Sequence, residues 1–306
     1  MDISIIIVNY NTRDFIEKCL LSIYSRRHKA SFEVFVVDNA SNDGSVEMVR
    51  DKFPSVNLTA NPQNTGFGAA NNIAMKKSSG EYILLLNSDA ELTDYALDNC
   101  VDFMRNHPAC GIMGGKLLYP DGTTQVSVCP FPSLYIAFTQ HLLLVRLFPN
   151  SRIFAPHRNA LSKSDYEKEQ KVDWVSGAFM AVNRKCLEQT GLFDEKFFLY
   201  YEETDLCLRC HNAGWEIWYS PSAAAIHYAN KTTVKFKPKV FEYSSTSLVY
   251  YFLKHKPLFS IIALKAMLFP LVCVRLLLNL PARLAGSDDA KTRAVSYNNV
   301  LKYIMR

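Results

Sequence analysis

The chain has 306 residues, of which 49% are hydrophobic and 21% are charged, with 12 glycines and 13 prolines. This composition supplies a sizeable core and excludes a disordered, collagen-like or low-complexity protein. The formal net charge of +5 is unevenly distributed, because residues 1–230 carry 21 Lys/Arg and 26 Asp/Glu, whereas residues 231–306 carry 13 and 3. The basic residues of the second part are mixed with Leu, Phe and Ile, so we expect it to meet lipid head groups rather than nucleic acid.

The N-terminus and the cysteines both bear on the compartment. The opening "MDISIIIVNY" has an acidic residue, a short apolar run and no small-residue cleavage site, so it predicts a first strand rather than a signal peptide. Of eight scattered cysteines, only Cys207 and Cys210 are close in sequence, and one such pair makes a poor zinc site. We therefore expect free or structural thiols in a reduced, cytoplasmic setting.

The first 90 residues alternate apolar runs with segments of helical periodicity. The runs predict strands at residues 3–10, 32–41, 56–61 and 81–89, with helices at 13–25, 45–53 and 64–80. Such repetition predicts parallel βαβ units, in which ligands bind beyond the carboxyl ends of the strands. Asn9, Asp38 and Asp89 each fall at such an end, so the sequence predicts a binding site there.

The middle of the chain is less regular. Apolar patterns predict strands at 111–122, 172–184 and 216–228, and a helix ends near Gly214. Residues 133–152 form an apolar insert that ends in basic residues.

The acidic pair in "YILLLNSDAELT" has two interpretations. Acidic residues favour the start of a helix, which accounts for Glu91 but not for Asp89 at the end of an apolar strand. Alternatively, Asp89 binds Mg²⁺ or Mn²⁺, cations that typically take one or two carboxylates together with substrate phosphates.

Seven segments occur together in a characteristic order. They are "SIIIVNYNTRDFIEKCLLSI", "VVDNASNDGS", "NTGFGAANNIA", "YILLLNSDAEL", "WVSGAFMAVNR", "GLFDEKFFLYYEETDLCLR" and "GWEIWYSPSAAAIHY". In this the chain resembles family 2 glycosyltransferases, specifically the bacterial rhamnosyltransferase-like branch, over residues 3–228. The resemblance implies an α/β protein of GT-A fold, with a Rossmann-like, mostly parallel sheet flanked by helices. It also implies an inverting enzyme that uses a nucleotide-diphosphate sugar. We expect a catalytic domain at 1–230, with a nucleotide-binding half at about 1–120 and an acceptor half at 121–230.

The resemblance assigns roles around the donor. Asp38 corresponds to the aspartate that accepts a hydrogen bond from the pyrimidine ring, although a turn-capping role is the alternative. Trp174 corresponds to the sugar and acceptor pocket, with a core aromatic as the alternative. The remaining predicted donor-site residues are Asn9, Tyr10, Asn64, Gly66, Gly68, Ser88, Ser176 and Gly177.

The resemblance also implies metal ligands and a base. Asp89 and His227 would bind the metal, and Asn87 stands where many relatives have a further aspartate. Inverting transfer needs a carboxylate to take the acceptor's proton. We expect Glu203 to be this base, with Glu202 or Asp205 as the second choice, and Asp205 is better explained by an ion pair with Arg209 four residues on.

The apolar composition of residues 258–285 predicts a helix that associates with a membrane. Lys265, Arg275 and Arg283 interrupt the apolar run and share one side of a helix, if Pro270 and Pro281 only kink it. This predicts a C-terminal amphipathic helical tail over 231–306 that attaches through 256–285 to a membrane surface. The resemblance to bacterial enzymes implies that this surface is the cytoplasmic face of the bacterial inner membrane. The alternatives are a helix packed on the catalytic domain, or between subunits of a homo-oligomer, and a spanning pair. The insert at 134–148 would be a second contact.

These features together predict an enzyme that extends a lipid-linked saccharide in cell-surface polysaccharide synthesis. L-rhamnose from dTDP-rhamnose is the expected sugar, on resemblance alone. The alternatives are a UDP-sugar-using enzyme of the same fold and a scaffold protein that binds nucleotide sugars without turnover. A nucleotidyltransferase would need a glycine-rich loop after the first strand, which "VNYNTRDF" lacks.

Overall fold

The computed structural model describes residues 1–141, 144–156, 159, 161–162, 165–229 and 237–306. The chain divides into two compact units. The first comprises Met1–Phe131, Ala160–Lys196 and Glu202–Thr232, and the second comprises Pro132–Asn159, Phe197–Tyr201 and Thr233–Arg306. The predicted domain boundary at 230–231 lies outside the described residues.

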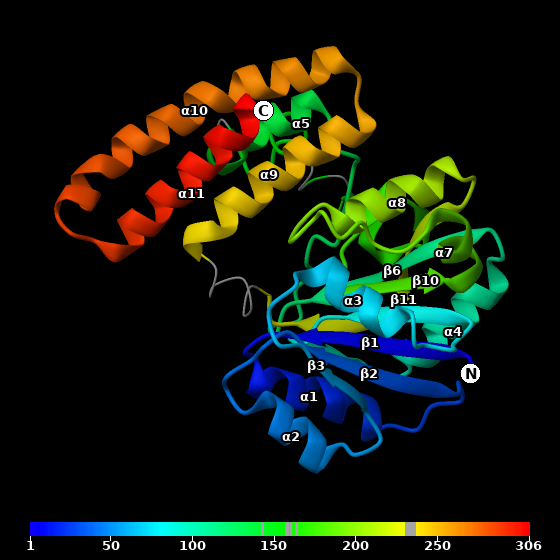
Figure 1. Ribbon diagram of the computed structural model, residues 1–306. Coiled ribbons are helices and arrows are strands. Elements are labelled where there is room, and N and C mark those ends of the chain that lie inside the picture. The colour runs from blue at the N-terminus through cyan, green and yellow to red at the C-terminus, as the bar shows by residue number, and fades with distance from the viewer. Residues whose placement is uncertain (142–143, 157–158, 160, 163–164, 230–236) are drawn as a thin grey trace. The chain divides into compact units, whose positions relative to one another are not determined.

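A nine-stranded sheet, counted over the described residues, forms the centre of the first unit (Figure 1). Its order is β3 (Asn57–Ala60), β2 (Phe32–Asp38), β1 (Ile3–Asn9), β4 (Tyr82–Leu86), β10 (Phe179–Asn183), β6 (Cys110–Leu118), β11 (Glu216–His227) and β5 (Ala90–Leu92), with β8 (Gln170–Lys171) beside β11. Strands β5, β8 and β10 run against the other six. The predicted mostly parallel sheet is therefore confirmed.

Successive residues of β1 serve two different cores. Ile3, Ile5 and Ile7 pack with α1 (Arg13–Tyr24), α2 (Ser45–Lys52) and α4 (Ala96–Asn106). Ile6 packs on the opposite face with α3 (Phe67–Met75), α7 (Arg184–Thr190) and α8 (Glu202–Asn212). Figure 1 shows α1 and α2 on one side of the sheet and α3 on the other. Because both faces are covered, the strand is apolar throughout and lacks alternation.

One predicted strand is wrong. The segment 172–184 forms two strands, β9 (Trp174–Val175) and β10, rather than one. The break arises because β9 pairs with β7 (Val128–Cys129) in a separate two-stranded sheet, whereas β10 joins the central one. A single 3₁₀ turn, Asp165–Glu167, precedes β8 in the described part of the chain.

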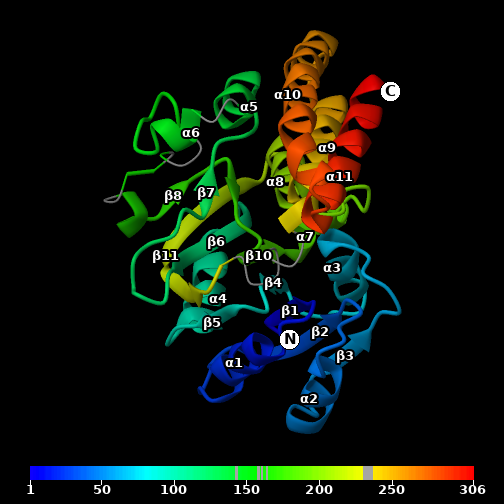
Figure 2. The same cartoon turned by 90° about the vertical axis from the view of Figure 1, so that its left-hand side faces the viewer.

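The second unit is helical in its described residues. It contains α5 (Leu134–His141), α6 (Leu144–Leu147), α9 (Lys237–His255), α10 (Leu258–Leu284) and α11 (Asp288–Met305). Figure 2 shows α9, α10 and α11 side by side. Helix α10 runs through both Pro270 and Pro281. Its Arg275 guanidinium lies over the Phe241 ring of α9, 4.4 Å from the ring centroid.

The two faces of α10 differ in burial but both are apolar. The buried face packs in the second unit through Ile261, Leu264, Leu268 and Val272. The exposed face carries Leu258, Phe259, Ile262, Phe269, Val274, Leu277, Leu278, Leu280 and Leu284. Within the described residues, α10 is the one helix long and apolar enough to cross a membrane, judged by length and composition alone.

Candidate active site

The ends of β1 and β2 place two predicted donor-site residues side by side. The parallel register sets Asn9 opposite Asp38, and both side chains are buried. Asn9 Nδ2 donates to Asp38 Oδ2 at 2.8 Å, and the Ser41 backbone N–H donates to Asp38 Oδ1 at 2.8 Å. Each carboxylate oxygen keeps a second lone pair. Asp38 is therefore a fixed acceptor at the strand ends, and Ser41 is a partner that the sequence did not indicate.

A hydroxyl pair extends this arrangement to the end of β4. Thr12 Oγ1 donates to Asn9 Oδ1 at 2.6 Å and lies 2.8 Å from Ser88 Oγ. Since Thr12 has one hydroxyl proton, Ser88 is the donor in the second contact. The hydrogen-bond chain Asp38–Asn9–Thr12–Ser88 thus joins three strand ends.

A loop lies next to this chain of contacts. Asn39, which is buried, donates from Nδ2 to Asn64 Oδ1 at 3.0 Å and to the Gly66 carbonyl at 3.1 Å. Its Oδ1 accepts from the Thr65 backbone N–H at 3.1 Å. The φ of +88° at Gly66 favours glycine. Tyr10 is half-buried at the end of β1. Asn39 therefore holds the predicted nucleotide loop, a role that its sequence position does not indicate.

Two glycines that were predicted to line the donor site, Gly68 and Gly177, lie against side chains of the protein itself. A Cβ on Gly68 would lie 3.1 Å from Phe193 Cβ and 3.6 Å from Glu202 Cβ. A Cβ on Gly177 would lie 3.3 Å from the ring of Phe67. Both glycines therefore allow α3 to approach its neighbours closely. The Trp174 indole N–H donates to the Pro130 carbonyl at 2.9 Å, so its polar atom has a protein partner.

Asp89, which follows β4, meets His227, the last residue of β11. The distance from His227 Nε2 to Asp89 Oδ1 is 3.2 Å, and the side chains are 12% and 5% exposed. Adjacent ligands of an octahedral Mg²⁺, at bonds of about 2.1 Å, lie about 3 Å apart, so this pair fits two positions around such a cation. Among the described residues no group of three or more His, Cys, Asp or Glu could hold a metal ion. Two protein ligands suit a cation that also binds substrate phosphates.

Asn87 and Glu91 each lie two residues from Asp89 in the sequence. Asn87 Nδ2 lies 3.2 Å from His227 Nε2. Glu91 lies in β5, where it accepts a hydrogen bond from the Tyr228 hydroxyl at 2.7 Å. Helix α4 begins at Ala96, so Glu91 does not cap it.

Glu202 and Glu203 form the first turn of α8. Glu202 Oε2 and Glu203 Oε2 are buried and have no hydrogen-bond partner in the described part of the structure. Desolvation raises the pKa of Glu203 to about 7. Desolvation, followed by the charge of Glu203, raises the pKa of Glu202 well above its usual value. Tyr200 and Tyr201, with φ of +69° and +70°, precede them. Strained backbone of this kind is concentrated at functional sites.

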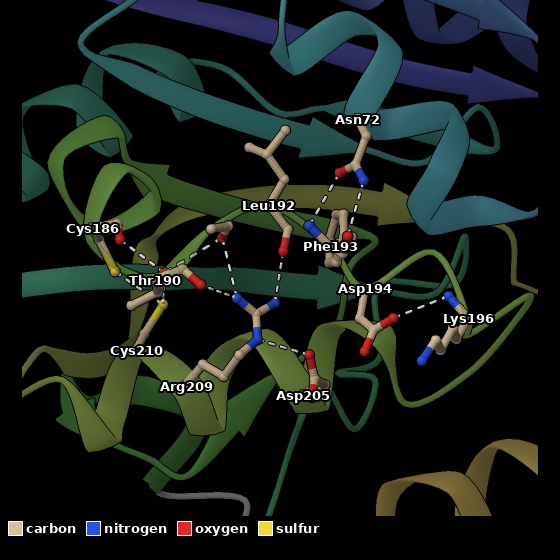
Figure 3. Close-up of polar contacts among 11 residues, drawn as sticks. Asn72, Cys186, Thr190, Leu192, Phe193, Asp194, Lys196, Asp205, Arg209 and Cys210 are labelled. Carbon is tan, nitrogen blue, oxygen red and sulfur yellow. Dashed lines mark hydrogen bonds and ion pairs between the residues drawn. The ribbon is translucent and has the colours of Figure 1, made fainter. Parts of the chain in front are cut away.

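Asp205 has a different role from these two acids. Figure 3 shows the Arg209 guanidinium between Asp205 and the carbonyls at and just after the end of α7. Arg209 Nε donates to Asp205 Oδ2 at 2.8 Å, which confirms the predicted ion pair. Its other nitrogens donate to the carbonyls of Thr190, Gly191 and Leu192. Asp205 thus anchors α8 to the preceding segment.

The fold of the chain is that of GT-A glycosyltransferases. Mannosyltransferase PcManGT from Pyrobaculum calidifontis, solved in complex with GDP-Man and Mn²⁺, aligns with a TM-score of 0.55 at 18% identity, covering 99% of this chain and 86% of that one. At this identity the similarity shows the fold alone.

Sequence comparison identifies the family. The model of the family described as "Glycosyl transferase family 2" matches residues 4–169 of the chain. N-acetylglucosaminyl-diphospho-decaprenol L-rhamnosyltransferase of Mycobacterium tuberculosis is 30% identical over 241 residues, covering 75% of this chain and 76% of that protein. Rhamnosyltransferase WbbL of Escherichia coli K12 is 25% identical, covering 81% of this chain and 91% of that protein. The chain therefore belongs to glycosyltransferase family 2, as its motifs predicted.

Proposed function

We propose that the enzyme transfers L-rhamnose from dTDP-L-rhamnose to a saccharide carried on a lipid diphosphate, with inversion at the anomeric carbon. The names of the two relatives support the sugar, and that of the mycobacterial protein supports a lipid-diphosphate acceptor. The observation that carries the proposal is the close approach of Asp89 and His227 at the strand ends. This pair suits a nucleotide diphosphate bound with a cation.

The donor would bind across the ends of β1, β2 and β4. In this proposal the pyrimidine N–H donates to Asp38, with Asn9 and Tyr10 beside the base. The loop held by Asn39 lies against the nucleotide. Asp89 and His227 would hold Mg²⁺ or Mn²⁺, which when bound supplies positive charge to the departing diphosphate.

Glu203 is the proposed general base. Its carboxylate takes the proton of the acceptor hydroxyl as that oxygen forms a bond to the anomeric carbon. The bond from the anomeric carbon to the diphosphate oxygen breaks on the opposite face, and dTDP leaves with the electron pair. The product is thereby inverted. A pKa near 7 suits this role, because a base is most effective when its pKa lies near the working pH.

The second unit is the proposed membrane contact. The exposed apolar face of α10 and the charge of residues 231–306 suit an anionic leaflet, where the lipid-linked acceptor would be found. We place the enzyme on the cytoplasmic face of the bacterial inner membrane as a peripheral protein. Flotation with anionic vesicles tests this placement. Unchanged binding after deletion of residues 256–306 would argue against it.

A panel of nucleotide sugars tests the reaction. The purified enzyme is incubated with Mg²⁺ or Mn²⁺, a polyprenyl-diphosphate saccharide and each donor, and release of the nucleotide diphosphate is measured. We expect release from dTDP-L-rhamnose, with the product's anomeric configuration determined by NMR. Release from a UDP-sugar instead would refute the proposed donor, and a retained configuration would refute inversion.

A further inference from the structure

Gln125 lies between β6 and β7 and contacts the candidate metal ligand His227 twice. It is 6% exposed, and its backbone N–H donates to the Leu117 carbonyl at 2.8 Å. Its side-chain Nε2 donates to the His227 carbonyl at 2.5 Å and to the Leu118 carbonyl at 3.3 Å. Its Oε1 lies 2.9 Å from His227 Nδ1.

These contacts determine which way the amide of Gln125 points. Backbone carbonyls only accept hydrogen bonds, so the atom facing His227 O and Leu118 O must be the NH₂ group. The amide oxygen then faces His227 Nδ1. Because an amide oxygen only accepts, Nδ1 must carry a proton.

A proton on Nδ1 leaves Nε2 of the neutral ring with a lone pair. That lone pair accepts from Asn87 Nδ2 at 3.2 Å, on the side of the ring where Asp89 Oδ1 also lies 3.2 Å away. An imidazole lone pair and a carboxylate oxygen repel each other unless a cation lies between them. In the other neutral tautomer, Nε2–H would donate directly to Asp89 Oδ1 and occupy both ligands.

We propose that Gln125 is a positioning residue that holds His227 in the Nδ1–H tautomer, so that the Nε2 lone pair can exchange its contact with Asn87 for a divalent cation shared with Asp89. The inference rests on the proposed metal site. Gln125 would not contact the substrate, and it would influence the metal site only through the imidazole ring of His227. Polar residues that orient metal-binding histidines in this way typically change metal affinity by about 10–100-fold.

The experiment measures the tautomer of His227 and the affinity of the protein for Mn²⁺ separately. The tautomer of His227 is read from its ring ¹⁵N chemical shifts in the metal-free protein at about pH 8.5, where an ordinary histidine is neutral. The signals are assigned by their absence from His227→Gln. Mn²⁺ affinity is measured by electron paramagnetic resonance, with Mn²⁺ alone and with dTDP.

Gln125→Met removes the amide at nearly constant length, and Gln125→Glu keeps an acceptor for Nδ1–H. Gln170→Leu is the matched control, because the Gln170 side chain also donates to a backbone carbonyl, that of Asp165. We expect Gln125→Met to gain the Nε2–H tautomer and to weaken Mn²⁺ binding by about 10–100-fold. Gln125→Glu should keep the Nδ1–H tautomer, and Gln170→Leu should match the wild type in both measurements.

Two results would overturn the inference. One is a wild-type protein in which His227 is mainly the Nε2–H tautomer. The other is a Gln125→Met variant with wild-type tautomer and Mn²⁺ affinity. If Gln125→Met does not fold, loss of the Nδ1–H tautomer in Gln125→Glu would overturn it equally. Failure of the proposed function is distinguishable, because it would appear as unchanged Mn²⁺ binding in Asp89→Ala, whatever the tautomer.

Discussion

Replacing Arg209 by methionine should damage both the stability of the first unit and its catalysis. The substitution keeps the apolar stem of the side chain but removes the guanidinium that joins Asp205 to the carbonyls of Thr190, Gly191 and Leu192 (Figure 3). Asp205 lies in the first turn of α8 together with Glu203. A loosened helix start would therefore misplace the proposed base.

The expected cost follows from burial. The Asp205 side chain is fully buried and that of Arg209 is 18% exposed. Removing one partner of a buried ion pair costs about 3–5 kcal/mol, because a charge is left without compensation. Because Arg209 is partly exposed, water can reach the charge left on Asp205, so we expect a loss of about 3–4 kcal/mol in the free energy of unfolding. Converting Asp205 to asparagine in the same protein removes the uncompensated charge, and we expect the double variant to recover about 2 kcal/mol.

Urea unfolding followed by tryptophan fluorescence measures this cost. The three tryptophans, Trp174, Trp215 and Trp218, all lie in the first unit, so the signal reports on that unit. Arg184→Met is the control, since the Arg184 guanidinium donates to the Gly80 carbonyl and the Ser78 hydroxyl. It should cost about 1–2 kcal/mol. An Arg209→Met variant no less stable than Arg184→Met would refute the reasoning.

Four further predictions concern turnover and membrane binding. Glu203→Gln should lower kcat by about 10²–10⁴-fold while leaving donor affinity unchanged, measured by steady-state kinetics and calorimetry. In the wild type, the raised pKa of Glu203 means that the base loses its carboxylate form as the pH falls, so the rate should halve near pH 7 and level off above it. When Mn²⁺ is added back to enzyme treated with a chelator, turnover should recover in the wild type but not in Asp89→Ala. Full recovery in the variant would contradict the assignment of Asp89 as a metal ligand. Leu278→Glu should weaken vesicle binding by at least about tenfold, because it charges a residue that is 77% exposed on α10, whereas unchanged flotation would exclude this face.

The strands that position the site could be predicted from sequence because each is a long apolar run. The predicted ends at Asn9 and Asp38 coincide with the ends of β1 and β2, whereas β4 ends at Leu86, three residues before Asp89. By contrast, β5 was not predicted, since it has three residues and forms only by pairing with β11 far along the chain. Local periodicity carries no information about such a distant partner.

The candidate site divides in a similar way. The residues named from motifs lie at strand ends and helix starts, where the surrounding pattern marks them. Thr12, Asn39 and Gln125 were missed because their contacts come from packing between distant segments. Gln125, for example, meets His227 across 102 positions of sequence. A lone buried amide in a loop gives no sequence signal of its own.

The close approach at Gly68 limits how this enzyme could be re-engineered. A methyl group there would press on Phe193 and come within ordinary contact distance of Glu202, beside the proposed base. In a directed-evolution library aimed at new donor sugars, most variants substituted at this position would therefore be inactive. Variation is better directed to neighbouring codons, leaving the small residue untouched.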